Sequence, residues 1–208
     1  MREPVVDERM RAYYDRRATE YDDWWLGRGL YAQLDRPGWD EEVERVCQVV
    51  RSLPPCRVLD VACGTGFLTQ HLRGEVVGLD QSAAMVEVAW ARLPGARIVR
   101  GDAVPLPFAG GEFDRLFTGH FYGHLLPDER ERFLEEARHV ANELVVVDSA
   151  LREGVDAEEW QERVLNDGTR HRVYKRYFTG PSLADEFGGG DVLHDGRWFA
   201  AVACNIGV

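Results

Sequence analysis

The sequence lacks any apolar run that approaches the roughly 20 residues of a membrane-spanning helix. Its start, Met-Arg-Glu-Pro-Val-Val-Asp, lacks the apolar core of a signal peptide. The four cysteines, Cys47, Cys56, Cys63 and Cys204, lack paired CxxC spacing. These absences predict reduced thiols, no membrane partner and a cytoplasmic location.

An excess of basic charge is also missing. The chain has 25 Lys and Arg against 36 Asp and Glu, a formal net charge of −11. This balance argues against a nucleic-acid backbone as the main partner, because phosphate binding needs clustered Lys and Arg. The 208 residues, 45% apolar and 29% charged, are enough for one well-filled α/β domain and hardly for two.

Strand and helix patterns alternate along most of the chain, which predicts a parallel sheet covered on both faces. The expected strands are 57–61, 75–79, 96–100, 113–118 and 143–148. The expected helices are 8–21, 38–53, 67–73, 82–92 and 128–141, the last of them capped by Asp128 and Glu131.

The end of the chain follows a different pattern. Residues 171–178 alternate as a strand, and a short helix is expected over 181–187. Residues 191–205 read as two strands around Asp195-Gly196, or as one long bent strand. Because little room is left for a crossover, we expect the last two strands to pair antiparallel.

The most informative segment is Val58-Leu-Asp-Val-Ala-Cys-Gly-Thr-Gly66, which runs from an apolar strand into a glycine turn. Asp80 lies twenty positions after Asp60, at the end of the next apolar run. This layout brings the backbone close to an extended ligand and holds a sugar diol with a carboxylate. The segment therefore predicts a site for a nucleoside cofactor.

The same turn disfavours phosphorylated ligands. No GxxxxGK[ST] string is present, and the third glycine of a GxGxxG pattern is replaced by Thr69. The turn also has no Lys or Arg, whereas Asp60 beside it favours a cationic ammonium group. A nicotinamide oxidoreductase is therefore the weaker interpretation.

On these residues the segment resembles motif I of the class I S-adenosylmethionine-dependent methyltransferases. Their acidic residue and small residues match Asp60, Ala62, Gly64 and Gly66, with Ala62 in place of the commonest glycine. Further matches are Asp80, Gly101-Asp102-Ala103, Pro105-Leu-Pro-Phe108 with Phe113-Asp114, and the stretch from Tyr14 to Tyr21. The last resembles a cofactor-capping helix of a small-molecule subgroup. The likeness covers about residues 10–150, but the usual Pro-Gly-Gly before the fifth strand is replaced by residues 140–144.

The resemblance implies an α/β fold: a Rossmann-like, doubly wound, seven-stranded, mostly parallel sheet with an antiparallel final strand and an N-terminal helical cap. A single methyltransferase domain is expected over 1–208, with the cap at 1–53 and the core at 54–208. The implied cofactor is S-adenosylmethionine, with S-adenosylhomocysteine as product. The expected cofactor-binding residues are Tyr14, Tyr21, Asp60, Ala62, Gly64, Gly66, Asp80, Gln81, Met85, Asp102, Ala103, Thr118 and Gly119.

Some of these residues have a structural interpretation beside the functional one. Tyr14 and Tyr21 either pack in a core or place their phenols on the methionine carboxylate of the cofactor. His120, just past the fourth strand, is a plausible general base, whereas His124 is better explained by packing. A His-x-x-x-His metal pair is disfavoured because no third ligand suggests itself.

The implied reaction is in-line displacement at a sulfonium methyl, with a small-molecule acceptor and a monomer or homodimer as the working unit. The acceptor pocket is expected from N-terminal aromatics, the loop at 119–126 and the final strands. The aromatics are Tyr13, Trp24, Trp25 and Tyr31. The basic cluster at 170–176 is either a solvated strand edge or the source of an arginine for an acceptor carboxylate or phosphate. A cofactor-binding protein without transfer activity is the alternative function.

Overall fold

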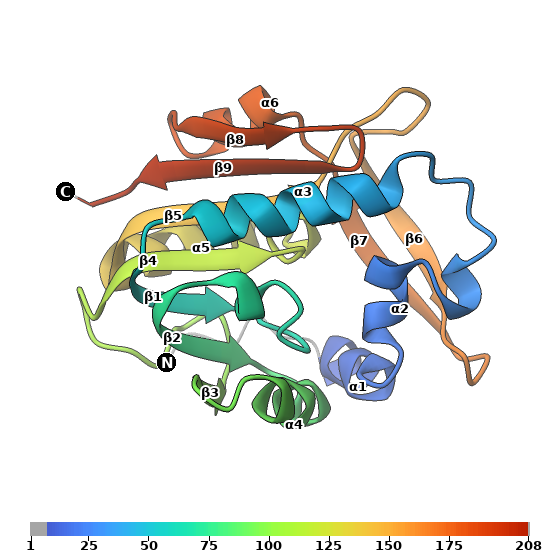
Figure 1. Cartoon of the computed structure of the whole chain (residues 1–208), viewed down its shortest axis with the longest axis horizontal. Coiled ribbons are helices and arrows are strands. Elements are labelled where there is room, and N and C mark those ends of the chain that lie inside the picture. The colour runs from blue at the N-terminus through green and yellow to red at the C-terminus, as the bar shows by residue number, and fades with distance from the viewer. Residues whose placement is uncertain (1–7, 208) are drawn as a thin grey trace.

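A computed structural model describes residues 8–207 and is built around a sheet with the strand order β3-β2-β1-β4-β5-β9-β8 (Figure 1). Its strands are β1 (Cys56–Val61), β2 (Gly74–Asp80), β3 (Arg97–Arg100), β4 (Phe113–Gly119), β5 (Ala141–Ser149), β8 (Asp191–Asp195) and β9 (Phe199–Asn205). A separate two-stranded sheet consists of β6 (Glu158–Val164) and β7 (Arg170–Arg176).

The α-helices are α1 (Glu8–Arg17), α2 (Tyr21–Leu26), α3 (Trp39–Ser52), α4 (Ala83–Arg92), α5 (Pro127–Val140) and α6 (Gly180–Glu186). Short 3₁₀ turns are η1 (Gly29–Tyr31), η2 (Thr69–His71) and η3 (Tyr122–His124).

The pairing confirms the expected doubly wound, mostly parallel sheet. Strands β1 to β5 pair in parallel, and β9 pairs antiparallel with both β5 and β8. In Figure 1 the arrowheads of β1, β2 and β4 point toward α1, α2 and the β6–β7 hairpin. Helices α1 and α2 and the two strands of this hairpin therefore cover the end of the sheet at which ligands bind in open α/β folds.

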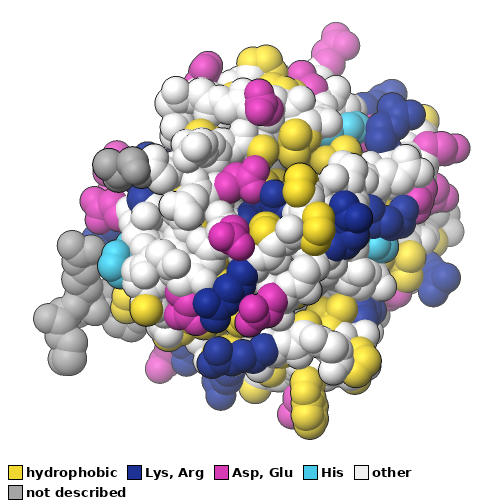
Figure 2. Space-filling view, turned by 60° about the vertical axis from the view of Figure 1, so that its left-hand side comes forward, with side chains coloured by type: hydrophobic (Ala, Val, Ile, Leu, Met, Phe, Trp, Pro, Cys, Tyr) yellow, Lys and Arg dark blue, Asp and Glu magenta, His cyan; other side chains and the backbone are white. Residues whose placement is uncertain are grey.

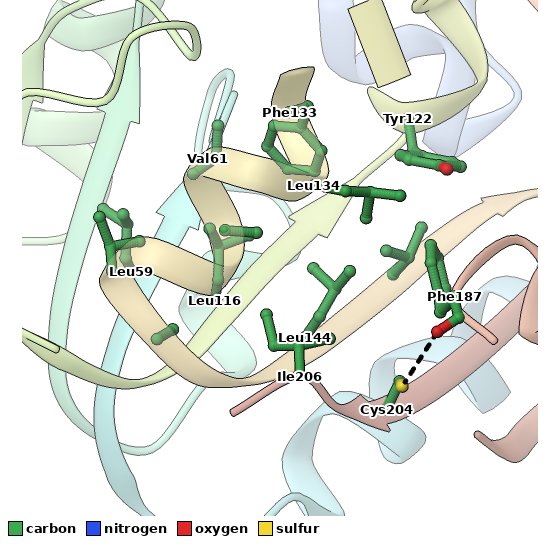
Figure 3. Close-up of a cluster of buried hydrophobic side chains, with 14 of the residues drawn as sticks. Leu59, Val61, Leu116, Tyr122, Phe133, Leu134, Leu144, Phe187, Cys204 and Ile206 are labelled. Atoms are coloured by element: carbon green, nitrogen blue, oxygen red, sulfur yellow. Dashed lines mark hydrogen bonds between the residues drawn. The ribbon is translucent and has the colours of Figure 1, made fainter. Parts of the chain in front are cut away.

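Alternation along the strands places one set of side chains under α5 and α6. In β1 and β4 these are Leu59, Val61 and Leu116, all fully buried. Phe133 of α5 packs against this face, since helical spacing turns its apolar stripe toward the sheet. Figure 3 shows part of this cluster, including the contact of the Cys204 thiol with a backbone carbonyl.

The alternate residues of the same strands point to the opposite face. Val58 and Phe117 meet Val46 and Val50 of α3, whose apolar residues recur at helical spacing. Two stacking interactions stabilise this layer, because the ring of Trp25 lies nearly parallel to those of both Phe67 and Phe199. The sheet is therefore buried on both faces, as the alternation of strands and helices along the chain predicted.

Two predicted helices differ in the structure. The helix expected over 8–21 ends at Arg17, and α2 starts afresh at Tyr21 in another direction, which lets Trp25 reach the core. The helix expected over 67–73 is only the turn η2, because the backbone is already extended at Leu72. The expected cap segment includes residues 1–7, which lie outside the described residues.

Two further predictions need correction. Helix α5 begins at Pro127, and the carboxylate of Glu129 accepts a 2.7 Å hydrogen bond from the amide of Leu126. Asp128 and Glu131 do not form the cap.

Strand β6 was not predicted, because its sequence, Glu-Glu-Trp-Gln-Glu-Arg-Val, is mostly polar and half exposed. It forms a ladder with β7, outside the main sheet.

No helix within residues 8–207 is long and apolar enough to cross a membrane. Figure 2 shows one face of the molecule, on which Lys and Arg side chains are interspersed with Asp and Glu.

Candidate functional site

The turn after β1 uses backbone conformations that favour glycine. Gly64 and Gly66 have φ of +55° and +80°, and Ala62 has φ of +58° despite its Cβ. At position 64 a Cβ would lie 3.6 Å from the ring of Tyr21, and at position 66 it would lie 2.7 Å from a methyl group of Leu93. The turn is thus shaped both by its own φ angles and by close neighbours.

Asp80 is held in place by the backbone. One carboxylate oxygen accepts a 2.9 Å hydrogen bond from the amide of Gly64, and the other accepts a 2.9 Å bond from the amide of Ser82. Ser82 caps α4 by accepting a hydrogen bond from the amide of Met85 on its hydroxyl. Burial raises the pKa of Asp80 to about 6. The carboxylate is therefore tied to the glycine turn instead of being free.

Asp60 carries an unsatisfied buried oxygen. Its Oδ2 accepts a 2.6 Å hydrogen bond from the hydroxyl of Thr69, the residue that replaces the third glycine. Its Oδ1 is buried and has no hydrogen-bond partner among the residues that the structure describes. Burial raises the pKa of Asp60 to about 8, because a charged carboxylate is costly without a partner. This oxygen is suited to a ligand that brings positive charge or a hydrogen-bond donor.

A cavity of about 240 Å³ lies at the carboxyl ends of β1 and β2. Its wall includes Ala62, Leu79, Asp80, Gln81, Gly101, Ala103, Val104, Phe121 and Leu125. Asp102 stands behind this wall and forms a 3.1 Å ion pair with Arg11 of α1. A mostly apolar slot with a few fixed polar groups is typical of a small-molecule site.

Three smaller cavities continue from the first. One of about 30 Å³ is lined by Tyr14, Tyr21, Ala62, Gly64, Asp80, Met85, His120 and Phe121. One of about 20 Å³ is lined by Tyr21, Trp25, Asp60, Ala62, Cys63, Phe67, Leu68, Phe117 and Gly119. Shared walls at Ala62 and Tyr21 join them in a row.

The third small cavity, also about 30 Å³, is called the histidine chamber below. It is lined by Tyr14, Arg17, Tyr21, Trp24, His120, His124, Ser149 and Arg163. It shares Tyr14, Tyr21 and His120 with the neighbouring cavity. A row of cavities therefore runs from the nucleoside-sized slot past the glycine turn to a small polar and aromatic chamber.

Most of the predicted cofactor residues lie along this row. Three do not line it: Gly66 shapes the turn, Asp102 pairs with Arg11, and Thr118 is fully buried, where its hydroxyl donates a 2.8 Å hydrogen bond to the carbonyl of Val61. Thr118 therefore ties β4 to β1. Of the expected pocket aromatics, Trp24 lines the histidine chamber and Trp25 lines the cavity beside Asp60.

His120 stands in a strained and aromatic setting. Its φ is +57°, and its ring lies 4.4 Å from that of Trp24 and 5.0 Å from that of Trp25. Its Nδ1 is 3.4 Å from the hydroxyl of Ser149, and its buried Nε2 has no partner within residues 8–207. Desolvation drives the pKa of His120 well below its ordinary value, so the ring is neutral.

His124 has a fixed tautomer. Its Nδ1 lies 2.7 Å from the carbonyl oxygen of Tyr174, so this nitrogen must carry the proton and donate it. Desolvation also lowers the pKa of His124 well below its ordinary value. The bond anchors η3 to β7, in line with the packing role expected for this histidine. The described part of the chain contains no cluster of three or more His, Cys, Asp or Glu that could hold a metal ion.

Arg17 also lines the histidine chamber, and no pattern in the sequence distinguishes it. It is only 3% exposed, and its guanidinium donates to the hydroxyl of Tyr13 at 2.5 Å and contacts the hydroxyl of Tyr31 at 3.4 Å. It also lies over the ring of Tyr21, 4.9 Å from the centroid. No carboxylate within residues 8–207 pairs with it. Adjacent Arg16 and Arg17 look alike in the sequence, and only the fold distinguishes them.

The basic cluster at 170–176 separates into different environments. Arg170 and Arg176 form surface ion pairs with Glu162 and Glu186. Lys175 is buried and pairs with Asp148 at the end of β5. The cluster is therefore only partly a solvated strand edge.

Hydrogen bonds and an ion pair connect helices α1 and α2 to the glycine turn and to α4. The hydroxyl of Ser82 donates a 2.5 Å hydrogen bond to Asp15 of α1. Asp22 of α2 accepts a 2.6 Å bond from the hydroxyl of Thr65 and pairs with Arg92 of α4. We call these contacts the Asp15 and Asp22 latches; together they hold α1 and α2 closed over the glycine turn.

The sheet order and the glycine turn define a Rossmann-like fold, and the fixed carboxylates are suited to a nucleoside-type ligand. Residues 59–143 match the family model of the methyltransferase domain. Demethylmenaquinone methyltransferase from Thermotoga maritima is 35% identical over 132 residues, 61% of this chain and 54% of that protein. An uncharacterized methyltransferase from Alkaliphilus oremlandii is 25% identical over 142 residues, 65% of this chain and 63% of that protein. The chain thus spans about 54% and 63% of the lengths of these two curated relatives.

Solved structures agree over the whole chain. The DhpI-SAM-HEP complex has a TM-score of 0.76 and 24% identity, and covers 99% of both chains. The DhpI-SAH complex has a TM-score of 0.73 and 26% identity, and covers 96% of both chains. The chain thus contains a stretch, residues 59–143, that matches the methyltransferase domain, and it has the fold of these two solved structures.

Proposed function

We propose that this protein catalyses methyl transfer from S-adenosylmethionine to a small-molecule acceptor. The observation that supports this function best is the row of cavities, in which the histidine chamber adjoins the cavities beside Asp60 and Asp80 through Tyr14, Tyr21 and His120. A nucleoside slot and a second chamber with shared walls are what a two-substrate transfer requires.

The residues present fit the cofactor. The unsatisfied buried Oδ1 of Asp60 is suited to the ammonium group of the methionine tail, and the fixed carboxylate of Asp80 to the ribose diol. Burial raises the pKa of Tyr21 to about 12, so its phenol keeps its proton and can donate to a carboxylate. Arg17, beside Tyr21, adds positive charge for the same carboxylate.

When bound, S-adenosylmethionine supplies a methyl group on a positively charged sulfur, which an acceptor takes by in-line displacement. The protein aligns the two reactants and excludes water, and good alignment is worth up to about 7–11 kcal/mol. The latched helices and the ring of Trp24 close the chamber. A neutral His120 with an unpartnered Nε2 can accept a proton from an acceptor hydroxyl.

Calorimetry and a radiolabel assay test this function together. We expect the purified protein to bind S-adenosylhomocysteine and not NADH, and to transfer labelled methyl from S-adenosylmethionine to members of a small-molecule panel that includes quinols. Asp60→Asn should weaken cofactor binding, while exposed Glu87→Gln on α4 should leave it unchanged. Binding without transfer to any acceptor would instead favour a sensor, and absence of binding would refute the proposal.

A further inference from the structure

Arg163 of β6 reaches the histidine chamber as an uncompensated cation. Its Nε and Nη2 donate to the side-chain oxygen of Gln161 at 3.2 and 2.8 Å. That neutral amide is its only hydrogen-bond partner among the described residues, and no described carboxylate lies within ion-pair distance of it. A cation at a cavity wall without a counter-charge is suited to an anionic ligand.

Gln161 holds this guanidinium in one orientation. The amide nitrogen of Gln161 donates to the carboxylate of Glu159 at 2.8 Å and to the hydroxyl of Tyr177 at 2.5 Å. These acceptors fix the nitrogen end, so the amide oxygen must face Arg163. The arginine is therefore positioned by a neutral group, although β6 places a carboxylate only two residues before that group.

The charges around the chamber leave Arg163 unmatched. Lys175 is neutralised by Asp148, and both chamber histidines are neutral. In the function proposed above, the positive charge of Arg17 is paired with the carboxylate of the cofactor. One arginine at the chamber wall remains without a counter-charge.

We propose that the methyl acceptor carries an oxyanion, a carboxylate or a phosphate, which binds Arg163 in the histidine chamber. This inference rests on the proposed function and narrows its substrate class. It disfavours protonated amines, which the unmatched Arg163 would repel despite the aromatic wall of Trp24. Gln161 is a positioning residue in this scheme.

The test measures thermal unfolding of the S-adenosylhomocysteine complex at constant ionic strength with inorganic phosphate, acetate or neutral acetamide. We expect phosphate or acetate, and not acetamide, to raise Tm by about 2–4 °C at several times its dissociation constant. A response to phosphate alone assigns a phosphate-type acceptor, and a response to acetate assigns a carboxylate.

Two variants separate binding at Arg163 from general salt effects. The Arg163→Gln substitution should weaken binding of the anion by about tenfold or more. Gln161→Glu keeps the arginine but gives it an internal carboxylate, and it should abolish the shift as well. Arg170→Gln, an exposed arginine on the same hairpin, is the matched control and should respond like the unaltered protein.

The outcomes are distinguishable. Failure of the unaltered protein to bind S-adenosylhomocysteine would refute the proposed function itself. Normal binding of that compound with no anion-specific shift, or with equal shifts in Arg163→Gln and the unaltered protein, would overturn only the oxyanion inference.

Discussion

The hydroxyl of Thr65, inside the glycine turn, donates a 2.6 Å hydrogen bond to the carboxylate of Asp22 on α2. The same carboxylate pairs with Arg92, which also donates to Thr65 at 3.2 Å. The turn that shapes the cofactor site thus holds the helix that covers it.

Loss of this latch should weaken ligand retention. In Asp22→Asn the ion pair to Arg92 is lost, and we expect S-adenosylhomocysteine to dissociate about tenfold faster, the effect of one charge-assisted hydrogen bond. Stopped-flow displacement measures this rate. Glu87→Gln on the exposed side of α4 is the control, and identical dissociation rates in both variants would contradict a latch.

The buried charge of Asp60 should make stability depend on pH. Its pKa is raised from 3.8 to about 8, so the folded protein keeps a proton that the unfolded chain loses. The contribution of this group is fully present below pH 3.8 and is lost as pH rises through about 8. The Asp60→Asn variant has no carboxyl group to ionise and does not undergo this loss. Its free energy of unfolding, relative to that of the unaltered protein, should therefore increase by a few kcal/mol as the pH rises. Urea unfolding at several pH values checks this, and parallel stability curves would count against it.

Substitutions in the buried ion pair of Lys175 and Asp148 should have non-additive effects on stability. Both side chains are almost fully buried, and Asp148 also accepts 2.7 Å hydrogen bonds from the amides of Gly123 and Ser149. Lys175→Met or Asp148→Asn alone should cost about 3–5 kcal/mol, because each leaves a buried partner unmatched.

The double variant should lose less than the sum of the two single losses. Denaturant unfolding gives all three values, with the exposed Arg170–Glu162 pair as the control, which should contribute almost nothing. Strict additivity would show that the charges do not interact.

His120 should act as a base over a wide pH range. Asparagine tolerates positive φ, so His120→Asn tests the imidazole with little added backbone strain. For a hydroxyl acceptor we expect transfer to fall by about 10²–10⁴-fold with unchanged affinity for S-adenosylhomocysteine.

Because desolvation lowers the pKa of His120 well below 6.5, the transfer rate should stay level as pH falls to that value. A pH–rate profile of the unaltered enzyme checks this. His139→Asn, an exposed histidine, is the control; full activity of His120→Asn would exclude the base role.

The sequence predicts the core of this protein well because apolar alternation and the glycine turn are local signals. Strands β1 to β5 and the positions of Asp60 and Asp80 follow from them. Strand β6 has no such signal, since its register depends on β7 and its inward side chains are polar. The pairing of Arg163 with a neutral amide at the cavity wall, like the burial of Arg17, depends on tertiary contacts that no spacing rule reveals.

Hydrogen bonds of Asp15 and Asp22 hold the covering helices in place, and the histidine chamber of about 30 Å³ has room for about one water molecule. Binding of a larger molecule in this chamber therefore requires the helices to move. At high ligand concentration the observed association rate should level off at the rate of that movement, instead of rising without limit as simple diffusional capture would require.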